Sequence, residues 1–379
     1  QYLEDILDML RKGEIQYSSL INDLVMPLMD RVSNFVQECI AKGKVNYDKD
    51  AIDATIVFIK KLNENNIQYP DTPDGEHNII EAAVLPFEKL HRVYRSRYAG
   101  NHDQIAKDGE NVCRDIKNSL SKFKHVIISG EYFLTLNKVA IMDLLEKTGY
   151  DSEKGITIIC YVRRPSSYWL SALQQRLKGS TTVDNVLEQK YPFKSGLLNW
   201  IEIAGKENVI VRPFDRNLLK NGDVVSDFYD QIYKITGSEI NNPTLADEKN
   251  KSVSAEKCIL MQELREELIS LVDDTFTDES RKLIRLLNSN GKNLQQSRMK
   301  FHPHVSTFID HHHAEDILWL KKQFGVVLPL PEPPNEESKA AAIRIFSEGR
   351  VRGLLTGYNQ EVLDKYRKIV VKRFNQIVE

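Results

Sequence analysis

Two adjacent arginines and a serine are the residues of this sequence best suited to bind an anion. Arg163 and Arg164 follow an apolar, β-branched run, and Ser171 comes eight residues after Arg163. The helix that we predict next begins near Ser166 or Ser167, either of which can cap it. A guanidinium group and a hydroxyl beside the N–H groups of a helix start are suited to bind a phosphate. A solvated arginine pair next to a helix cap fits the same residues, so the local chemistry leaves both interpretations open.

Polar residues also follow two other predicted strands. The run 125–129 leads to Glu131, and the run 208–212 ends in Arg212 and leads to Phe214. In open parallel sheets, ligands bind beyond the carboxyl ends of the strands. This rule selects both groups, together with the arginine pair, as candidate site residues.

The elements around these residues alternate between strands and helices. Short β-branched runs predict strands, and the apolar residues after each run recur with helical spacing. Three strand–helix pairs in succession predict a parallel sheet with right-handed crossovers. We expect strands at 125–129, 155–162 and 208–212, and helices after them at about 136–147, 166–177 and 224–235.

The rest of the chain has helical patterns. We expect an N-terminal helical segment at 1–70, an α/β core at 71–253 and a C-terminal helical region at 254–379. Four prolines in 329–334 predict a rigid loop. Further helices are expected at 78–97, 104–122, 254–272, 278–289, 305–324, 336–348 and 358–377.

Composition excludes some classes of protein. The 379 residues include 52 lysines and arginines against 54 aspartates and glutamates, and a net charge of −2 argues against a general nucleic-acid binder. No apolar run of about 18 residues occurs, so we expect no transmembrane segment. Four widely spaced cysteines are typical of reduced, mostly buried thiols in the cytoplasm. Because the sequence begins with Gln1, we expect it to be a fragment or a trimmed chain, and to belong to a larger chain or an oligomer.

The segment 161–171 resembles the 3'-phosphate-binding motif of sulfotransferases that use 3'-phosphoadenosine 5'-phosphosulfate (PAPS). That family places an arginine at a strand end, a proline two residues later and a serine eight residues after the arginine; here these are Arg163, Pro165 and Ser171. The resemblance implies an α/β fold with a three-layer parallel sheet of the P-loop sulfotransferase type, with extensive helical additions at both ends. It also implies that the chain moves a sulfuryl group from PAPS to a hydroxyl and leaves 3'-phosphoadenosine 5'-phosphate (PAP).

Other segments extend the resemblance over about 57–325, with its specific part at 124–216. They are similar to bacterial carbohydrate sulfotransferases, which implies a saccharide or polysaccharide acceptor and no metal. The similar segments are 127–131, 209–214, 250–254, and 66–70 with His77.

The resemblance implies roles for single residues. Glu131 stands where related enzymes place the residue that takes the acceptor proton, although it also fits a cap for a helix near Thr135. Charge on the leaving phosphate would come from Arg164, Arg212 or Lys251. The aromatic residues Tyr168, Trp169 and Phe214 fit either stacking on an adenine or sugar ring, or the core, and the core is favoured.

One part of the family pattern is missing. The 5'-phosphosulfate is bound in this family by a Gly- and Thr-rich loop with a lysine, and no such loop is found; Gly43 and Lys44 lack its context. Either the loop has been lost, or it lies outside this sequence, as the likeness of 1–5 to the helix after such a loop suggests. A non-catalytic sulfotransferase-like module of a larger polysaccharide-biosynthesis protein is therefore the alternative function. A weaker alternative is another nucleotide-dependent transferase.

Five of the nine histidines lie between 302 and 313. A metal site requires ligands on one face of a helix, whereas consecutive histidines point in different directions. We therefore interpret the cluster as a solvated surface run. Its members are His302, His304, His311, His312 and His313.

Overall fold

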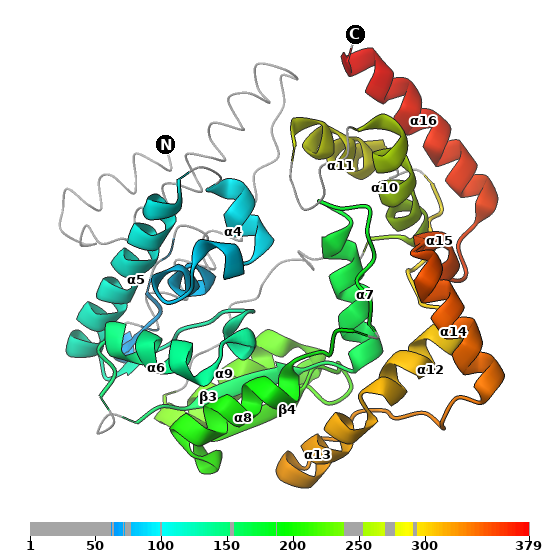
Figure 1. The fold of residues 1–379 in the computed structure, drawn as a ribbon. Helices are drawn as coiled ribbons and strands as arrows, with labels where there is room; N and C mark the ends of the chain where they lie inside the picture. Colours follow the sequence, from blue (N-terminus) through cyan, green and yellow to red (C-terminus); the bar gives the residue numbers. More distant parts are fainter. Residues whose placement is uncertain are drawn as a thin grey trace. The chain divides into compact units, whose positions relative to one another are not determined.

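The computed structural model describes residues 62, 64–70, 72, 77–98, 101–151, 155–186, 188–238, 253–269, 277–290 and 294–378. These residues form an α/β-type protein that is mostly helical and has two small parallel sheets (Figure 1). The strands are β1 (Ile67–Gln68), β2 (His125–Val126), β3 (Ile158–Val162) and β4 (Val209–Pro213). The α-helices are α4 (Arg92–Arg97), α5 (His102–Lys122), α6 (Lys138–Lys147), α7 (Pro165–Arg176), α8 (Phe193–Ala204), α9 (Val224–Thr236), α10 (Ala255–Leu268), α11 (Asp278–Asn290), α12 (Pro303–His312), α13 (Ala314–Phe324), α14 (Glu336–Glu348), α15 (Val351–Leu354) and α16 (Gln360–Val378).

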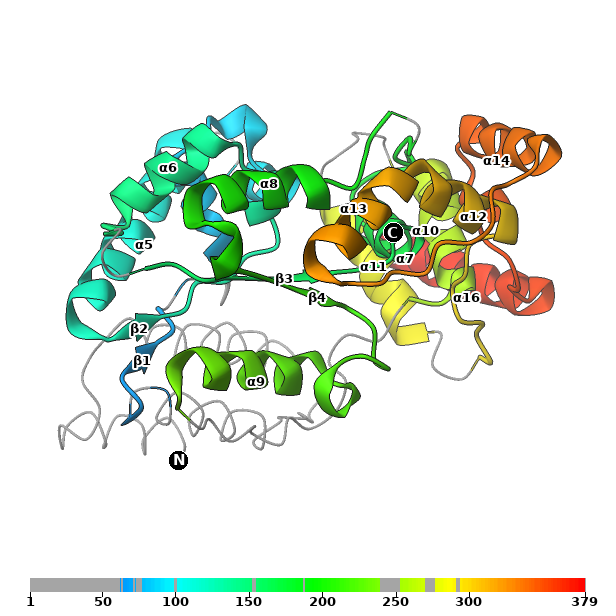
Figure 2. The same ribbon diagram turned by 90° about the horizontal axis from the view of Figure 1, so that it is seen from below.

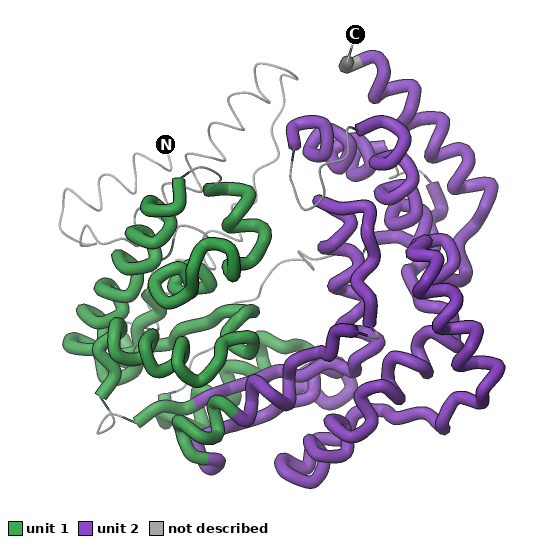
Figure 3. Tube along the Cα trace, viewed as in Figure 1, with its two compact units in different colours: residues 1–157, 199–205, 223–247 green, residues 158–198, 206–222, 248–379 purple. Residues whose placement is uncertain are grey.

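The chain divides into two compact units that alternate along the sequence (Figure 3). Unit 1 consists of residues 1–157, 199–205 and 223–247. Unit 2 consists of residues 158–198, 206–222 and 248–379. The predicted helices before residue 62, the Gly43–Lys44 pair and Lys251 lie outside the described residues.

In unit 1, the predicted strand 125–129 is reduced to β2, which pairs in parallel with β1. The sequence does not predict β1, because two residues are too few for a pattern. The 3-10 helix η1 (His77–Ala83) packs on α5, where Gly109 allows the two backbones to touch. A Cβ atom at Gly109 would lie 2.8 Å from the Ile79 carbonyl oxygen, so this contact requires glycine.

The helix predicted at 78–97 is wrong as a single element. The segment forms η1, a second 3-10 helix (Phe87–Lys89) and then α4. Pro86 precedes the second helix with extended backbone angles. Proline has no N–H to donate, and it disfavours helical angles at the residue before it, so a continuous α-helix is interrupted there.

In unit 2, β3 and β4 pair in parallel over five residues, from Ile158 with Val209 to Val162 with Pro213 (Figure 2). The three predicted strands therefore do not form one sheet within the described residues, since β2 pairs with β1 and β3 pairs with β4.

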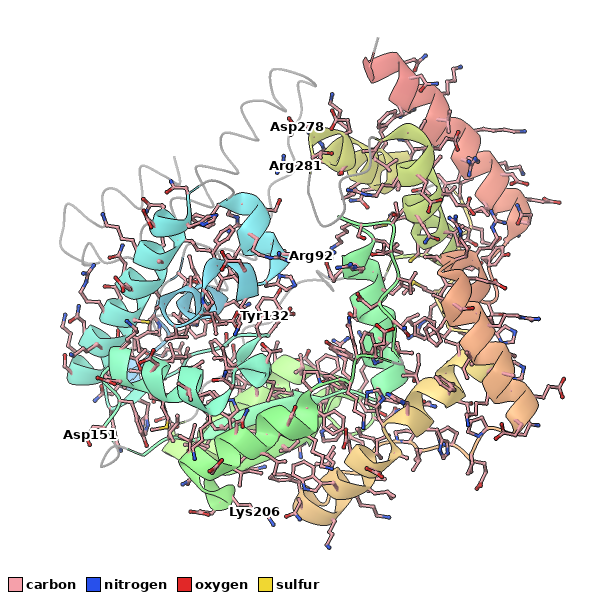
Figure 4. All side chains as sticks on the ribbon, viewed as in Figure 1. Arg92, Tyr132, Asp151, Lys206, Asp278 and Arg281 are labelled. Atoms are coloured by element: carbon pink, nitrogen blue, oxygen red, sulfur yellow. The ribbon has the colours of Figure 1, made fainter. Side chains whose placement is uncertain are left out.

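The C-terminal helices of unit 2 share one apolar core with α7. Trp169, Leu173 and Leu177 enter this core from α7 or just beyond it, with Leu260 and Leu264 from α10. The predictions for α10, α11, α14 and α16 agree with these helices to within a few residues, because apolar residues recur in each with helical spacing. The polar face of α11 begins with an exposed ion pair between Asp278 and Arg281, which are labelled in Figure 4.

Some elements differ from their predictions or have none. The segment predicted as one helix at 305–324 is two helices, α12 and α13, which meet at His313. Helices α8 and α15 correspond to no predicted element. None of the described helices is both long enough and apolar enough to cross a membrane.

Candidate functional site: an arginine-bearing strand end

The register of β3 and β4 places two candidate arginines on one face of unit 2. Buried and half-buried residues alternate along β4, and the buried ones are Val209, Val211 and Pro213. Cys160 and Val162 on β3, which pair with Val211 and Pro213, are also buried. Successive side chains of a strand point to opposite faces. Tyr161 and Arg212, which pair with each other, therefore lie on the opposite, half-buried face, and Arg163 continues that face beyond the end of β3.

Arg163 contacts an aromatic ring at this edge. Its guanidinium carbon lies 4.0 Å from the centre of the Phe214 ring. The Phe214 amide donates a hydrogen bond to the Val162 carbonyl oxygen at 2.8 Å, which extends the pairing past β4. This cation–π contact orients the guanidinium group at the end of β3.

Arg212 lies half-buried on the same face. Its Nη2 donates a long hydrogen bond of 3.4 Å to the carbonyl oxygen of Leu218, in the turn after β4. The structure therefore brings Arg163 and Arg212 to one face of unit 2 within a two-strand sheet. This arrangement provides positive charge at the carboxyl end of parallel strands, as the sequence predicts.

Helix α7 begins at Pro165, with Arg164 as its N-cap residue. The prediction that Ser166 or Ser167 caps the helix is wrong. Proline suits the first helical position because its φ angle is already helical and its missing N–H would have no partner there. Ser166 is consequently the second residue of the helix, and its own N–H needs an acceptor from elsewhere.

That acceptor is Asp310, near the end of α12. Its Oδ1 accepts a hydrogen bond from the Ser166 amide at 2.9 Å, and its Oδ2 accepts from the Ser166 hydroxyl at 3.0 Å. Arg164 donates to the same Oδ2 from Nε at 2.7 Å and forms an ion pair with it from Nη2 at 2.6 Å. The fully buried Asp310 carboxylate thus fills the start of α7, and the half-buried Arg164 is paired with it.

Ser171 lies in the second turn of α7 and is half-buried. No hydrogen bond joins its hydroxyl to another described residue. Tyr168, one turn earlier on the same side of α7, stacks on Tyr191 with ring centres 3.8 Å apart. Trp169 is 6% exposed and belongs to the core, so the core interpretation is confirmed for this residue.

Glu131 lies in unit 1 and is exposed. It does not cap a helix: Tyr132 precedes the 3-10 helix η3 (Phe133–Thr135), and the Asn137 side chain caps α6. No hydrogen bond or ion pair joins the Glu131 side chain to another described residue. The carboxylate is therefore open to solvent after β2, in a different unit from Arg163, Arg164, Ser171 and Arg212.

A buried histidine holds the turn that precedes Glu131. The Nδ1 of His77 accepts a hydrogen bond from the Ser129 amide at 3.1 Å, and its Nε2 lies 2.8 Å from the Pro70 carbonyl oxygen. A backbone N–H only donates and a carbonyl oxygen only accepts, so the ring is neutral with its proton on Nε2. Burial lowers the pKa of His77 to about 4. The sequence does not indicate that His77 is buried, because prolines and a glycine surround it in the chain.

Two neighbouring side chains complete this polar cluster in unit 1. The Tyr69 hydroxyl lies 2.6 Å from the Ser129 hydroxyl, and Asn78 Oδ1 accepts from the Tyr132 amide at 3.3 Å. Tyr132, labelled in Figure 4, also stacks on His91 with ring centres 4.2 Å apart. The turn that carries Glu131 is therefore fixed by side chains from η1 and the segment before it.

Glu81, on η1, is a further ionisable residue of unit 1 that the sequence does not single out. It is 2% exposed, and its Oε1 has no hydrogen-bond partner. Burial raises the pKa of Glu81 to about 8. The side chain is consequently a neutral acid at pH 7, which lowers the cost of burying it.

The histidine cluster is not a solvated run throughout. His313 is 1% exposed, with Nδ1 at 2.9 Å from the Ile309 carbonyl oxygen and Nε2 accepting from the Tyr191 amide at 2.9 Å. His311 Nε2 lies 2.9 Å from the carbonyl oxygen of Pro331 in the proline-rich loop. The surface interpretation is therefore wrong for His313, which lies at the end of α12 with its side chain buried. Within the described ranges, no three His, Cys, Asp or Glu residues gather as metal ligands.

Comparison with known proteins adds a partial likeness. No family model matches the chain, and no solved structure matches it. The chain is similar to an uncharacterized protein of Archaeoglobus fulgidus, with 29% identity over 145 residues. The matched segment covers 38% of this chain and only 39% of the archaeal protein. This likeness is distant and partial, and it identifies no family.

Proposed function

We propose that the chain is a PAPS-dependent sulfotransferase that transfers a sulfuryl group to a hydroxyl of a saccharide or polysaccharide. The observation that carries the proposal is the junction of β3 and α7. A parallel strand ends at Val162 and Arg163 follows it directly. The helix starts two residues after Arg163, and a hydroxyl without a described partner follows at Ser171. Arg163 and Ser171 would bind the 3'-phosphate of the donor, because a cation and a hydroxyl donor both favour a phosphate dianion.

The reaction assigned to this site is an in-line displacement at sulfur. The acceptor oxygen forms a bond to sulfur while the bond from sulfur to the 5'-phosphate oxygen breaks, and the products are a sulfate ester and PAP. Glu131 would take the acceptor proton, for which an exposed, unpaired carboxylate is suited. Arg212 would stabilise charge on the leaving phosphate.

The proposal includes the finer fold and the cellular site. It assigns the chain a three-layer parallel sheet of the P-loop sulfotransferase type and assigns the reaction to the cytoplasm. The three described cysteines, Cys113, Cys160 and Cys258, are buried and free, which supports a reducing compartment.

The pairing of Arg164 favours a second candidate, a non-catalytic sulfotransferase-like module. Asp310 already fills the start of α7, so this helix start offers a ligand less positive charge than the sequence suggests. In such a module the fold would serve binding or assembly within a larger protein, and the donor would not bind.

Calorimetric titration of the chain with PAP distinguishes the two candidates, with ADP and AMP as controls. The enzyme proposal expects micromolar binding that requires the 3'-phosphate and is lost in Arg163→Ala, with an unchanged thermal midpoint. Lack of binding by the folded wild-type chain would contradict it and favour the non-catalytic module.

A further inference from the structure

Two side chains at the end of α12 bond to the elements that carry Arg163. Asp310 accepts hydrogen bonds from the Ser166 amide and hydroxyl, and it pairs with Arg164. These bonds fix Arg164, which directly follows Arg163, and Ser166 in the first turn of α7. Asp310 therefore acts on the main chain after Arg163.

His313, three residues after Asp310, accepts a hydrogen bond from the backbone of Tyr191. The Tyr191 amide can only donate, so Nε2 of His313 is the acceptor, and its Nδ1 carries the proton that is donated to Ile309. Both ring nitrogens are thus used, and the ring cannot rotate without losing both bonds. The result is a fixed position for the Tyr191 backbone.

Tyr191, held in place by His313, contacts both Arg163 and α7. Its side chain forms a hydrogen bond with the Arg163 backbone. Its ring lies flat on Tyr168, with 9° between the two planes, and Tyr168 is one turn before Ser171 on α7. Tyr191 is only 7% exposed, so packing holds the ring in this place.

We propose that Asp310 and His313 are positioning residues of the nucleotide site. They hold the main chain after Arg163 and the position of Tyr191, and they align α7, so that Arg163 and Ser171 meet the same phosphate. The inference rests on the proposed function, because it concerns the 3'-phosphate of the donor. It assigns different tasks to the adjacent arginines: Arg164 neutralises Asp310 and anchors the turn, whereas Arg163 binds the ligand.

The first test compares substitutions of His313 with a matched neighbour. His313→Leu removes the acceptor for Tyr191, whereas the Oε1 of glutamine in His313→Gln can replace Nε2. The control is His312→Leu, because the His312 ring stacks on Phe308 and meets the His313 ring edge to face but forms no hydrogen bond with a described residue. Affinities for PAP and AMP are measured by calorimetry at a temperature at which every variant is folded.

We expect His313→Leu to weaken PAP binding about tenfold or more, since small displacements of binding groups carry costs of this size. AMP binding should change little, so that the preference for the 3'-phosphate falls. His313→Gln should restore most of the preference, and His312→Leu should leave it unchanged. A merely structural role would lower the thermal midpoint and weaken both ligands equally.

Two milder variants keep the test valid if His313→Leu does not fold. Tyr191→Phe removes only the hydroxyl that bonds to the Arg163 backbone and retains the stack on Tyr168. The double variant Asp310→Asn with Arg164→Gln removes the ion pair without changing net charge, and the asparagine oxygen can still cap Ser166. Both should reduce the preference for PAP over AMP.

The outcomes separate this inference from the proposed function. If the wild-type chain does not bind PAP, both are wrong. If it binds PAP and Arg163→Ala abolishes binding, but the folded Tyr191, Asp310 and His313 variants keep the wild-type preference for the 3'-phosphate, the positioning roles alone are overturned.

Discussion

His77 and Ser129 are joined by two hydrogen bonds that run in opposite directions. The His77 amide donates to the Ser129 carbonyl oxygen at 2.9 Å, and the Ser129 amide donates to Nδ1 of the His77 ring at 3.1 Å. The second bond exists only while the ring is neutral. The turn that presents Glu131 is thereby linked to the protonation state of one buried histidine.

Acid should therefore weaken unit 1. The pKa of His77 falls from 6.5 to about 4 on folding, so between these pH values the unfolded chain binds the proton more strongly. The contribution of a neutral His77 is complete above pH 6.5 and is lost as the pH falls toward 4, by up to about 3 kcal/mol. Urea unfolding of wild type and His77→Gln from pH 7.5 to 4 measures the contribution of His77 to the free energy of unfolding. The difference between the two curves should shrink with acid, and parallel curves would refute the assignment.

Glu81 should produce the opposite dependence. Its pKa rises from 4.5 to about 8 on folding, so the folded chain retains a proton that the unfolded chain releases, and stability falls as the pH rises between these values. Glu81→Gln removes this loss and should raise the free energy of unfolding at pH 8 by about 4 kcal/mol. At pH 4.5 the two proteins should be nearly equal. A variant that is less stable than wild type at pH 8 would show that the carboxylate is stabilised there.

Gly130 should not tolerate alanine. A Cβ atom would lie 2.6 Å from Asn78 Oδ1 and 2.7 Å from Phe133 Cζ, so the turn before Glu131 would have to shift. We expect Gly130→Ala to lower the free energy of unfolding by about 1–3 kcal/mol. Gly353→Ala is the matched control, because its Cβ would meet nothing closer than 3.7 Å. Chemical denaturation of both variants gives the comparison, and equal effects would contradict the steric argument.

Ser171 should matter for ligand binding and not for stability. Its hydroxyl bonds to no described residue, so Ser171→Ala leaves no donor or acceptor without its partner. A hydrogen bond to a charged group contributes about 1.5–3 kcal/mol, so PAP affinity should fall at least about tenfold. The thermal midpoint and the affinity for AMP should stay near wild type. Unchanged PAP affinity would remove Ser171 from the proposed site.

Local pattern predicts most of the described helices and β3 with β4, because their signals lie within a few neighbouring residues, but it misses α8 and α15. The strand at 158–162 and the helix after it follow directly from a β-branched run, a proline and an apolar stripe. The same reasoning misplaces the cap of α7, since the acceptor for Ser166 lies 144 residues later in the sequence. Nothing near Asp310 marks it as a partner of Arg164, because a carboxylate near a helix end is common on protein surfaces.

The candidate site is predicted in part for the same reason. Arg163 and Arg212 share a face because two adjacent strands pair in register, which alternation along each strand already implies. The burial of His77, Glu81 and His313 depends on packing between distant segments, so composition and spacing favour the wrong environment for them. His311 likewise contacts a distant segment, since its ring bonds to the Pro331 carbonyl group in the proline-rich loop after α13. No local pattern indicates this contact.

The alternation of the two units has a consequence for synthesis. The chain crosses between them five times, at 157, 198, 205, 222 and 247, and a single helix, α8, contributes residues to both. Neither unit can therefore be cloned as one continuous stretch of gene. During translation, the core of unit 2, whose first segment begins at residue 158, can close only after the C-terminal helices have been synthesised. In unit 1, β2 is synthesised long before residues 223–247, the last segment of that unit. The nascent chain consequently exposes apolar surface until late, and chaperone dependence during expression would follow from the order of the segments.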